Sequence, residues 1–415
     1  MKNSDFRRLF MGRLFLNLGD SLVYMICMWY LYQVTQDSFY TGVASFLFSL
    51  PVLLGMFWGP IVDRRDQRRL LGALSGLLVL ALLILSLVTH WLGFKLWFLL
   101  LAIPVLATAS EFLYPVGEAL LPRMVAQEEL TRANSWLMMS STGADLFFNA
   151  ISALILSLLS LNQLFGLTSL IFFLAFFCFK RIKTSNFPNK IEQEKRDFWG
   201  SYVRELKEGL AFVRQPLVLR LLFPLLLMNC IYTIFYESLP EFTSLNFQTP
   251  TVYGLLLMLL GIGAMLGSGL SEFVSTRIRT GYLVAFSYAI TGLAWVLAVV
   301  SLRIHVLPLT MLLTLLSGLS NGVVNVAYSV LFQKLPPQEM IGRVHTINMT
   351  MLQSSVPLAS LLGGLLVRNL GASTMMVICG ASLLLLSLSL LLSSSFRSLP
   401  KIEEIGEMGD SSSEG

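Results

Sequence analysis

Three carboxylates, Asp20, Glu111 and Asp145, lie inside long apolar segments of the chain. A charged side chain near the middle of a membrane helix costs roughly 2.5 to 3.5 kcal/mol on insertion scales, so it persists where it faces protein or water. Apolar surroundings disfavour the ionised form of a carboxylate, which allows such a group to bind a proton on one side of a membrane and release it on the other. These positions therefore predict proton coupling, with Asp20 the best-placed candidate, Asp145 second and Glu111 third.

Polar residues recur around these acids at steps of three or four, which places them on one face of each helix. We expect the stripes to line one substrate cavity, formed by Asn17, Asp20, Tyr24, Glu111, Asp145, Asn149, Glu237, Asn321, Asn325 and Gln353.

Several of these polar residues have a second interpretation. Asn321 and Asn325 are equally consistent with hydrogen bonds to a neighbouring helix. Glu237, together with Glu241, is also consistent with a cap at the outer end of its helix. Arg13 continues the first stripe, but we expect its side chain to reach back to the inner membrane surface.

The elements that carry these residues are apolar windows of about 20 residues, the length needed to cross a bilayer as a helix. Mean hydropathy is +0.73, and only 13% of residues are charged. The sequence therefore predicts an all-α polytopic membrane protein. Its twelve transmembrane helices are expected at 9–34, 42–62, 70–90, 95–117, 134–158, 162–180, 217–240, 251–273, 281–301, 305–333, 345–369 and 372–395.

A repeat and a polar interval divide these windows into two halves. Arg123 and Arg132 match Lys334 and Arg343 at a constant offset of 211 residues, as in transporters built from two six-helix halves. We predict an N-terminal half at 1–181, a cytoplasmic linker at 182–216, a C-terminal half at 217–396 and a disordered, acidic cytoplasmic tail at 397–415.

Basic residues predict the orientation. With both termini cytoplasmic, only Lys95, Arg303 and Arg368 of the 29 Lys and Arg lie outside, as the positive-inside rule requires. The net charge of +5 is therefore a signal of topology, and we expect no nucleic-acid partner. The four cysteines lie in apolar windows without metal-ligand spacing, so we expect neither a disulfide nor a metal.

A dense charge cluster lies in the short loop between the second and third windows, where Gly59, three further residues, Asp63-Arg64 and the bases Arg68 and Arg69 follow one another. This motif resembles the loop between helices 2 and 3 of the major facilitator superfamily. With Asp66 in place of the usual Gly, it is most similar to the branch of macrolide efflux pumps and siderophore exporters, although that branch usually has Arg where this chain has Gln67.

The resemblance implies a conformational gate formed by Gly59, Asp63, Arg64, Arg68, Arg69 and Arg343. It also implies a central cavity lined by helices 1, 4, 7 and 10, with helices 3, 6, 9 and 12 outside. Helix 5 lacks the Gly-Pro signature of drug-proton antiporters, so antiport is supported by the acids and by the resemblance.

From these observations we expect a secondary transporter, not an enzyme, in the cell membrane. It would export an amphipathic, cationic small molecule in exchange for protons, without a cofactor and as a monomer in contact with lipid. Export of a siderophore or lipid is one alternative, and a membrane sensor that binds a ligand without moving it is another.

The predicted topology can be tested by cysteine labelling in a background that lacks the four native cysteines. Cysteines at Asp37, Asn246 and Asn369 should react with impermeant thiol reagents from outside intact cells, because these positions follow odd-numbered helices. Labelling of a cysteine at Arg65 or Lys195 from outside would contradict the orientation.

Overall fold

The computed structural model describes residues 4–64, 66–121, 124–125, 129, 132–133, 136–137, 144–183, 215–303, 306–334, 341–399 and 401. All regular secondary structure in these residues is helical. Ten of the helices are long and apolar enough to cross a membrane, and α2 and α6 occupy the two remaining predicted windows. The predicted fold class is confirmed.

The N-terminal half contains α1 (Ser4–Thr35), α2 (Ser38–Arg64), α3 (Gln67–Leu92), α4 (Leu96–Leu120), α6 (Ala144–Leu158) and α7 (Leu161–Lys180). The C-terminal half contains α9 (Pro216–Phe247), α10 (Pro250–Ser275), α11 (Thr280–Arg303), α12 (Leu307–Lys334), α13 (Ile341–Leu370), α14 (Ala372–Leu392) and the short α15 (Ser394–Arg397). The helix α9 continues past the predicted end at 240, with Pro240 inside it.

The chain forms two compact units whose boundary passes through α9 and α10. One unit spans Met1–Gln193 and Thr243–Met258, and the other spans Glu194–Phe242 and Leu259–Gly415. The first turns of α10 belong to the first unit because Tyr253 stacks on Trp29 with ring centroids 6.3 Å apart. Most of the predicted linker lies outside the described residues, so the predicted domain boundaries stay predictions.

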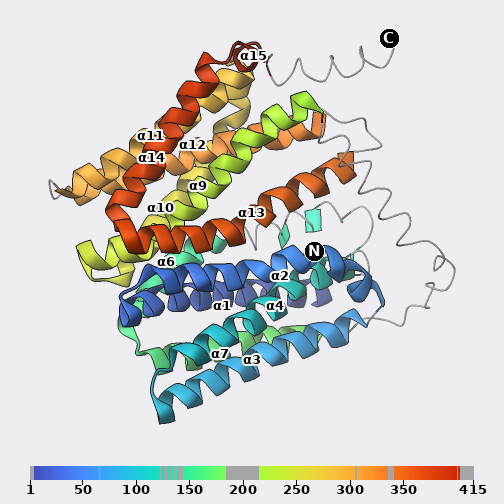
Figure 1. Cartoon of the computed structure of the whole chain (residues 1–415). Coiled ribbons are helices and arrows are strands. Elements are labelled where there is room, and N and C mark those ends of the chain that lie inside the picture. The colour runs from blue at the N-terminus through green and yellow to red at the C-terminus, as the bar shows by residue number, and fades with distance from the viewer. Residues whose placement is uncertain are drawn as a thin grey trace. The chain divides into compact units, whose positions relative to one another are not determined.

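Two glycines bring α1 close to α7 in the first unit. A Cβ atom added at Gly12 would collide with the Phe179 ring, and one added at Gly19 would lie 2.6 Å from the Phe172 ring. Both phenylalanines are about 1% exposed. The glycines therefore fix which face of α1 is pressed against α7. Figure 1 shows α7 running beside α3, its other main neighbour in this unit.

In the second unit, glycines allow the same close approach between α10 and α12. The space beside Gly263 and Gly267 on α10 is filled by backbone of Leu315 and Leu319 on α12. Gly318 and Gly322 on α12 face α10 backbone in the same way. Small residues spaced by four let membrane helices approach closely and gain van der Waals contact. Gly263 and Gly267 therefore serve the close packing of α10 against α12.

This packing predicts opposite effects for two neighbouring Gly→Ala changes on α10. Gly267→Ala places a methyl group against the Leu319 carbonyl, so it should destabilise the protein by about 1–3 kcal/mol. Gly269→Ala meets nothing within 4 Å, so the higher helix propensity of Ala should leave stability unchanged or raise it by up to about 1 kcal/mol. Thermal unfolding of the purified proteins measures both, and equal effects would refute the packing role.

Candidate functional site

A cavity of about 460 Å³ lies inside the first unit. Its walls come from α1, α2, α3, α4 and α7 and consist of Asn17, Asp20, Val23, Tyr24, Phe48, Leu78, Leu106, Ala107, Ser110, Glu111, Tyr114 and Phe172. Among the described residues, the lining thus contains two carboxylates and no Lys, Arg or His. Four predicted cavity residues, Asn17, Asp20, Tyr24 and Glu111, are brought together here.

Asp20 is held by two hydroxyl groups of α4. Ser110 Oγ donates to Asp20 Oδ1 at 2.5 Å, and Tyr114 Oη donates to Asp20 Oδ2 at 3.0 Å. Ser110 and Tyr114 are spaced by four residues, so one face of α4 presents both hydroxyls to α1. Neither residue was predicted from the sequence, although this spacing beside Glu111 was a signal that could have identified them.

The hydroxyl partners suit a carboxyl group that changes its protonation state. An ionised Asp20 accepts both hydrogen bonds, and charged acceptors form stronger hydrogen bonds than neutral ones. A protonated Asp20 has one O–H to donate, and a hydroxyl oxygen can accept as well as donate. Both hydroxyl contacts can therefore be kept in either protonation state without moving α1 away from α4.

Arg13 lies two turns before Asp20 and is buried, with 3% of its side chain exposed. Its Nη2 donates to the Tyr114 carbonyl oxygen and lies 3.3 Å from Glu118 Oε1. The guanidinium carbon also lies 5.0 Å from the centre of the Tyr114 ring. The expectation that Arg13 reaches to the membrane surface is therefore wrong, because α4 supplies its partners within the protein.

Tyr114 thus connects two charged residues of α1. Its ring and carbonyl contact Arg13, while its hydroxyl contacts Asp20. Gly117 makes room for the arginine, because a Cβ atom at that position would lie 3.3 Å from Arg13 Nε. Glu118 is 62% exposed, and its described ion pair is with Arg13 of α1.

The remaining cavity residues differ in exposure. Asn17 is buried, with 3% of its surface exposed, and Tyr24 packs on Phe48 with ring centroids 5.6 Å apart. Glu111 is exposed on the first unit while contributing to the cavity wall. Leu78 of α3 and Phe172 of α7 also line the cavity, so these helices contribute apolar walls in addition to packing outside.

The model of the Major Facilitator Superfamily matches residues 9–360 of this sequence, most of the chain. This chain belongs to the major facilitator superfamily. Members of this superfamily are membrane transporters, and the helical windows and the charge cluster at 59–69 agree with that assignment.

Several relatives within the superfamily span nearly the whole chain at low identity. Macrolide efflux protein A of Streptococcus pyogenes is 20% identical over 382 residues, which cover 89% of this chain and 91% of the relative. Macrolide efflux protein A of Enterococcus faecalis is 21% identical, covering 76% and 97%. The uncharacterized MFS-type transporter YvqJ of Bacillus subtilis is 23% identical, covering 96% and 94%.

Solved structures show the same fold. The nucleoside transporter NupG matches with a TM-score of 0.70 at 12% identity, covering 94% of this chain and 98% of that one. The POT family transporter PepTSo matches with a TM-score of 0.69 at 14% identity, covering 96% and 99%. At these identities the likeness concerns the fold alone.

Two predicted cavity residues lie on α6 of this facilitator. Asn149 is half-buried and does not line the cavity; its backbone carbonyl lies beside Gly254 of α10, within the first unit. The side chain of Asp145 lies outside the described residues, so its role stays a prediction.

In the second unit, the two glutamates of α9 are not caps of their own helix. α9 runs on to Phe247, so Glu237 lies well inside it, 3% exposed and with its Cγ beside Gly363 of α13. Glu241 Oε1 accepts from the Ala372 backbone N–H at 3.0 Å. Glu241 therefore caps the start of α14. The expectation that it is a helix cap is right, but the helix that it caps is α14 and not α9.

The amides of α12 and α13 remain candidates. Asn325 Nδ2 donates to Asn321 Oδ1 at 3.0 Å within α12, so the described contact is within one helix and not between helices. Asn325 and Gln353 are exposed on the second unit. Exposed amides are free to meet a substrate, and their membership of a common cavity stays a prediction.

The predicted gate is described in part. Gly59, Asp63 and Arg64 lie at the end of α2 and Arg343 at the start of α13, but their side chains lie outside the described residues. Arg68 and Arg69 are exposed at the start of α3.

Asp66, which replaces the usual Gly of the motif, has a clear structural role as the N-cap of α3. Its Oδ1 accepts from the backbone N–H groups of Arg68 and Arg69 at 3.0 and 3.3 Å. An aspartate here satisfies two of the free N–H groups at the start of the helix.

The burial of Arg13 predicts how the stabilities of variants at Arg13 and Glu118 compare. Glu118→Gln should lower the melting temperature, because it removes the carboxylate that Arg13 contacts among the described residues and leaves a buried guanidinium without a counter-charge. The double variant Arg13→Met/Glu118→Gln should be more stable than Glu118→Gln alone, because the buried charge is gone. The coupling between the two sites should be about 0.5–3 kcal/mol.

Thermal unfolding of the four proteins in one detergent completes this double-mutant cycle. Additive effects would mean that the Arg13–Glu118 ion pair contributes nothing, as is common for exposed pairs.

Proposed function

We propose that this protein is a proton-coupled exporter that moves an amphipathic, cationic small molecule out of the cell by alternating access. The observation that carries the proposal is the Asp20 carboxyl group, which lies on the cavity wall and accepts hydrogen bonds from two hydroxyl groups of α4.

The chemistry of the cavity supports the choice of a cationic cargo. Asp20 and Glu111 are acidic, and the lining residues that the structure describes include no basic side chain. Tyr24, Phe48, Tyr114 and Phe172 supply aromatic rings, which attract cations through their faces and bind apolar groups. A molecule with a basic nitrogen on an apolar body fits both features.

Coupling would follow from competition at Asp20. A cationic cargo stabilises the ionised carboxylate, whereas a proton neutralises it, so one site cannot hold both with full affinity. Alternate occupation on the two sides of the membrane is antiport. Asp145 and Glu111 are the second and third candidates for the same role.

The relatives named as macrolide efflux proteins support export as the direction and an amphipathic compound as the cargo. The distribution of Lys and Arg supports a plasma-membrane orientation with both termini in the cytoplasm. In the same scheme the gate residues, with Asp63 near Arg343, would close the cytoplasmic side in the outward-facing state.

The experiment that tests this function uses Asp20→Asn in proteoliposomes with an imposed pH gradient and a lipophilic, cationic dye as cargo. Uphill export of the dye should be abolished, because Asn cannot carry a proton. Downhill exchange of dye against dye should persist, because it needs no net proton movement.

Two sets of control variants locate the effect. Asp37→Asn makes the same chemical change at a residue that accepts from the Phe39 backbone N–H at 2.9 Å, away from the cavity, so it should transport normally. Ser110→Ala and Tyr114→Phe each remove one hydrogen bond to Asp20 and should shift the pH dependence of export without abolishing it. If Asp20→Asn, Asp145→Asn and Glu111→Gln each still drive uphill export, these acids do not carry the proton.

A further inference from the structure

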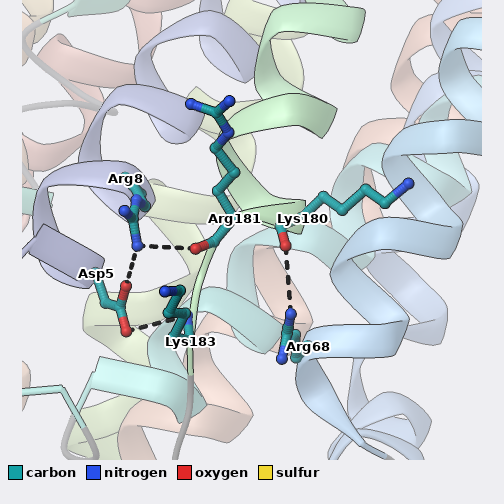
Figure 2. Close-up of polar contacts among 6 residues, drawn as sticks. All are labelled: Asp5, Arg8, Arg68, Lys180, Arg181 and Lys183. Carbon is teal, nitrogen blue, oxygen red and sulfur yellow. Dashed lines mark hydrogen bonds and ion pairs between the residues drawn. The ribbon is translucent and has the colours of Figure 1, made fainter.

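A cluster of basic residues lies at the carboxyl end of α7, and none of them lines the cavity. Lys180, Arg181 and Lys183 follow one another there, and Arg68 of α3 lies beside them (Figure 2). All four side chains are exposed. We call these four residues the α7 basic cluster.

The backbone that carries the cluster is held in place. Ile182 is fully buried, the Lys183 backbone N–H donates to Asp5 Oδ2 at 3.0 Å, and Arg8 Nη1 donates to the Arg181 carbonyl oxygen at 2.8 Å. Arg68 Nη2 lies 3.5 Å from the Lys180 carbonyl oxygen. A run of bases on a loop normally loses much entropy on binding, and this anchoring reduces that cost.

These contacts use the backbone of Lys180, Arg181 and Lys183, whereas Arg68 contributes its guanidinium group. Asp5 forms its ion pair with Arg8, at 2.6 Å. Among the described residues, no carboxylate lies within ion-pair distance of Lys180, Arg181 or Lys183. Figure 2 shows the side chains of Lys180 and Arg181 extending away from Asp5.

An apolar track leads along α7 to these charged ends. Phe173 and Phe177 are 47% and 44% exposed, and they share one face with Arg181 at steps of four residues. The Arg181 guanidinium lies 4.0 Å from the centre of the Phe177 ring, and Lys180 Nζ lies 5.4 Å from that of Phe176. In a membrane-spanning helix, exposed phenylalanines face the hydrocarbon, whereas bases at the helix end lie at the level of the headgroups.

We propose that the α7 basic cluster binds the headgroup of an anionic phospholipid. Arg181 contacts the phosphate beside Phe177, the other bases of the cluster add positive charge at the same membrane surface, and one acyl chain lies along Phe177 and Phe173. Cations near a helix C-terminus are further favoured by the helix dipole. This binding is independent of the proposed transport reaction and would fix the start of the segment that links the two halves at one membrane surface.

The test measures retention of dioleoylphosphatidylglycerol by the purified full-length protein, using native mass spectrometry over a lipid titration. The wild type should retain this lipid in preference to dioleoylphosphatidylcholine. The variant Lys180→Gln/Arg181→Gln should bind it about tenfold or more weakly, since each base near an anionic surface contributes substantially.

The matched control removes two bases from the second unit. Arg277 lies over the Phe273 ring at 3.5 Å and donates to the Phe273 carbonyl at 2.9 Å, so it repeats the arginine–phenylalanine contact without a comparable cluster. Arg277→Gln/Arg279→Gln should bind within about twofold of the wild type. Equal losses in both double variants would overturn the proposal, because the effect would then be one of overall charge.

Two further measurements separate this site from simpler explanations. The swapped variant Lys180→Arg/Arg181→Lys should keep the lipid, and its failure to do so would assign the effect to packing. Inorganic phosphate at the same phosphate concentration should not displace the lipid, because it cannot use the apolar track; displacement would overturn the proposed role of Phe173 and Phe177. Absence of any preference for the anionic lipid in the wild type would also refute the site.

Discussion

The Asp20 carboxyl group needs polar partners, because apolar surroundings disfavour a charged side chain. Ser110 and Tyr114 meet this need, and both lie on α4. The requirement fixes the register of α1 against α4, since a shift of either helix by one turn would separate the carboxyl group from at least one hydroxyl. The position of Arg13 beside Tyr114 and Glu118 follows from the same register. One half-buried acid thus links the alignment of two cavity helices.

The packing of α1 against α7 supports that alignment from the other side. Gly19 precedes Asp20 and lies directly against Phe172, so α1 cannot rotate without forcing its neighbours into the space that the missing Cβ leaves. Phe172 in turn contributes to the cavity wall. The close approach of the helices therefore sets the depth of the cavity as well as the direction of Asp20. The second unit repeats the principle between α10 and α12, where glycines meet carbonyl groups of the facing helix.

The sequence predicted the helices well because the length of an apolar run is a local property that the membrane imposes directly. Stripes at helical spacing also placed Asn17, Asp20, Tyr24 and Glu111 on one cavity, since side-chain direction follows from helix geometry.

The prediction for Arg13 was wrong because its partners lie on α4, about a hundred residues away, and no local pattern reveals them. Glu241 was misassigned for a similar reason, since the helix that it caps begins at Ala372. Hydroxyl groups such as Ser110 and Tyr114 are hard to recognise because most serines in membrane helices bond to their own backbone, as Ser49 and Ser354 do here.

The two charged residues of α1 that contact α4 differ in their described partners, and this difference bears on which one can change. Arg13 contacts a carboxylate, a carbonyl oxygen and an aromatic face, each of which attracts a cation. The described hydrogen bonds of Asp20 come from two neutral hydroxyls, which can be kept with or without a proton on the carboxyl group. A group that must exchange protons during a transport cycle needs the second kind of environment, because an ion pair with a fixed base would hold it in one state. Tyr114 contacts both residues, so a change in the charge of Asp20 acts on a side chain that the buried arginine already holds.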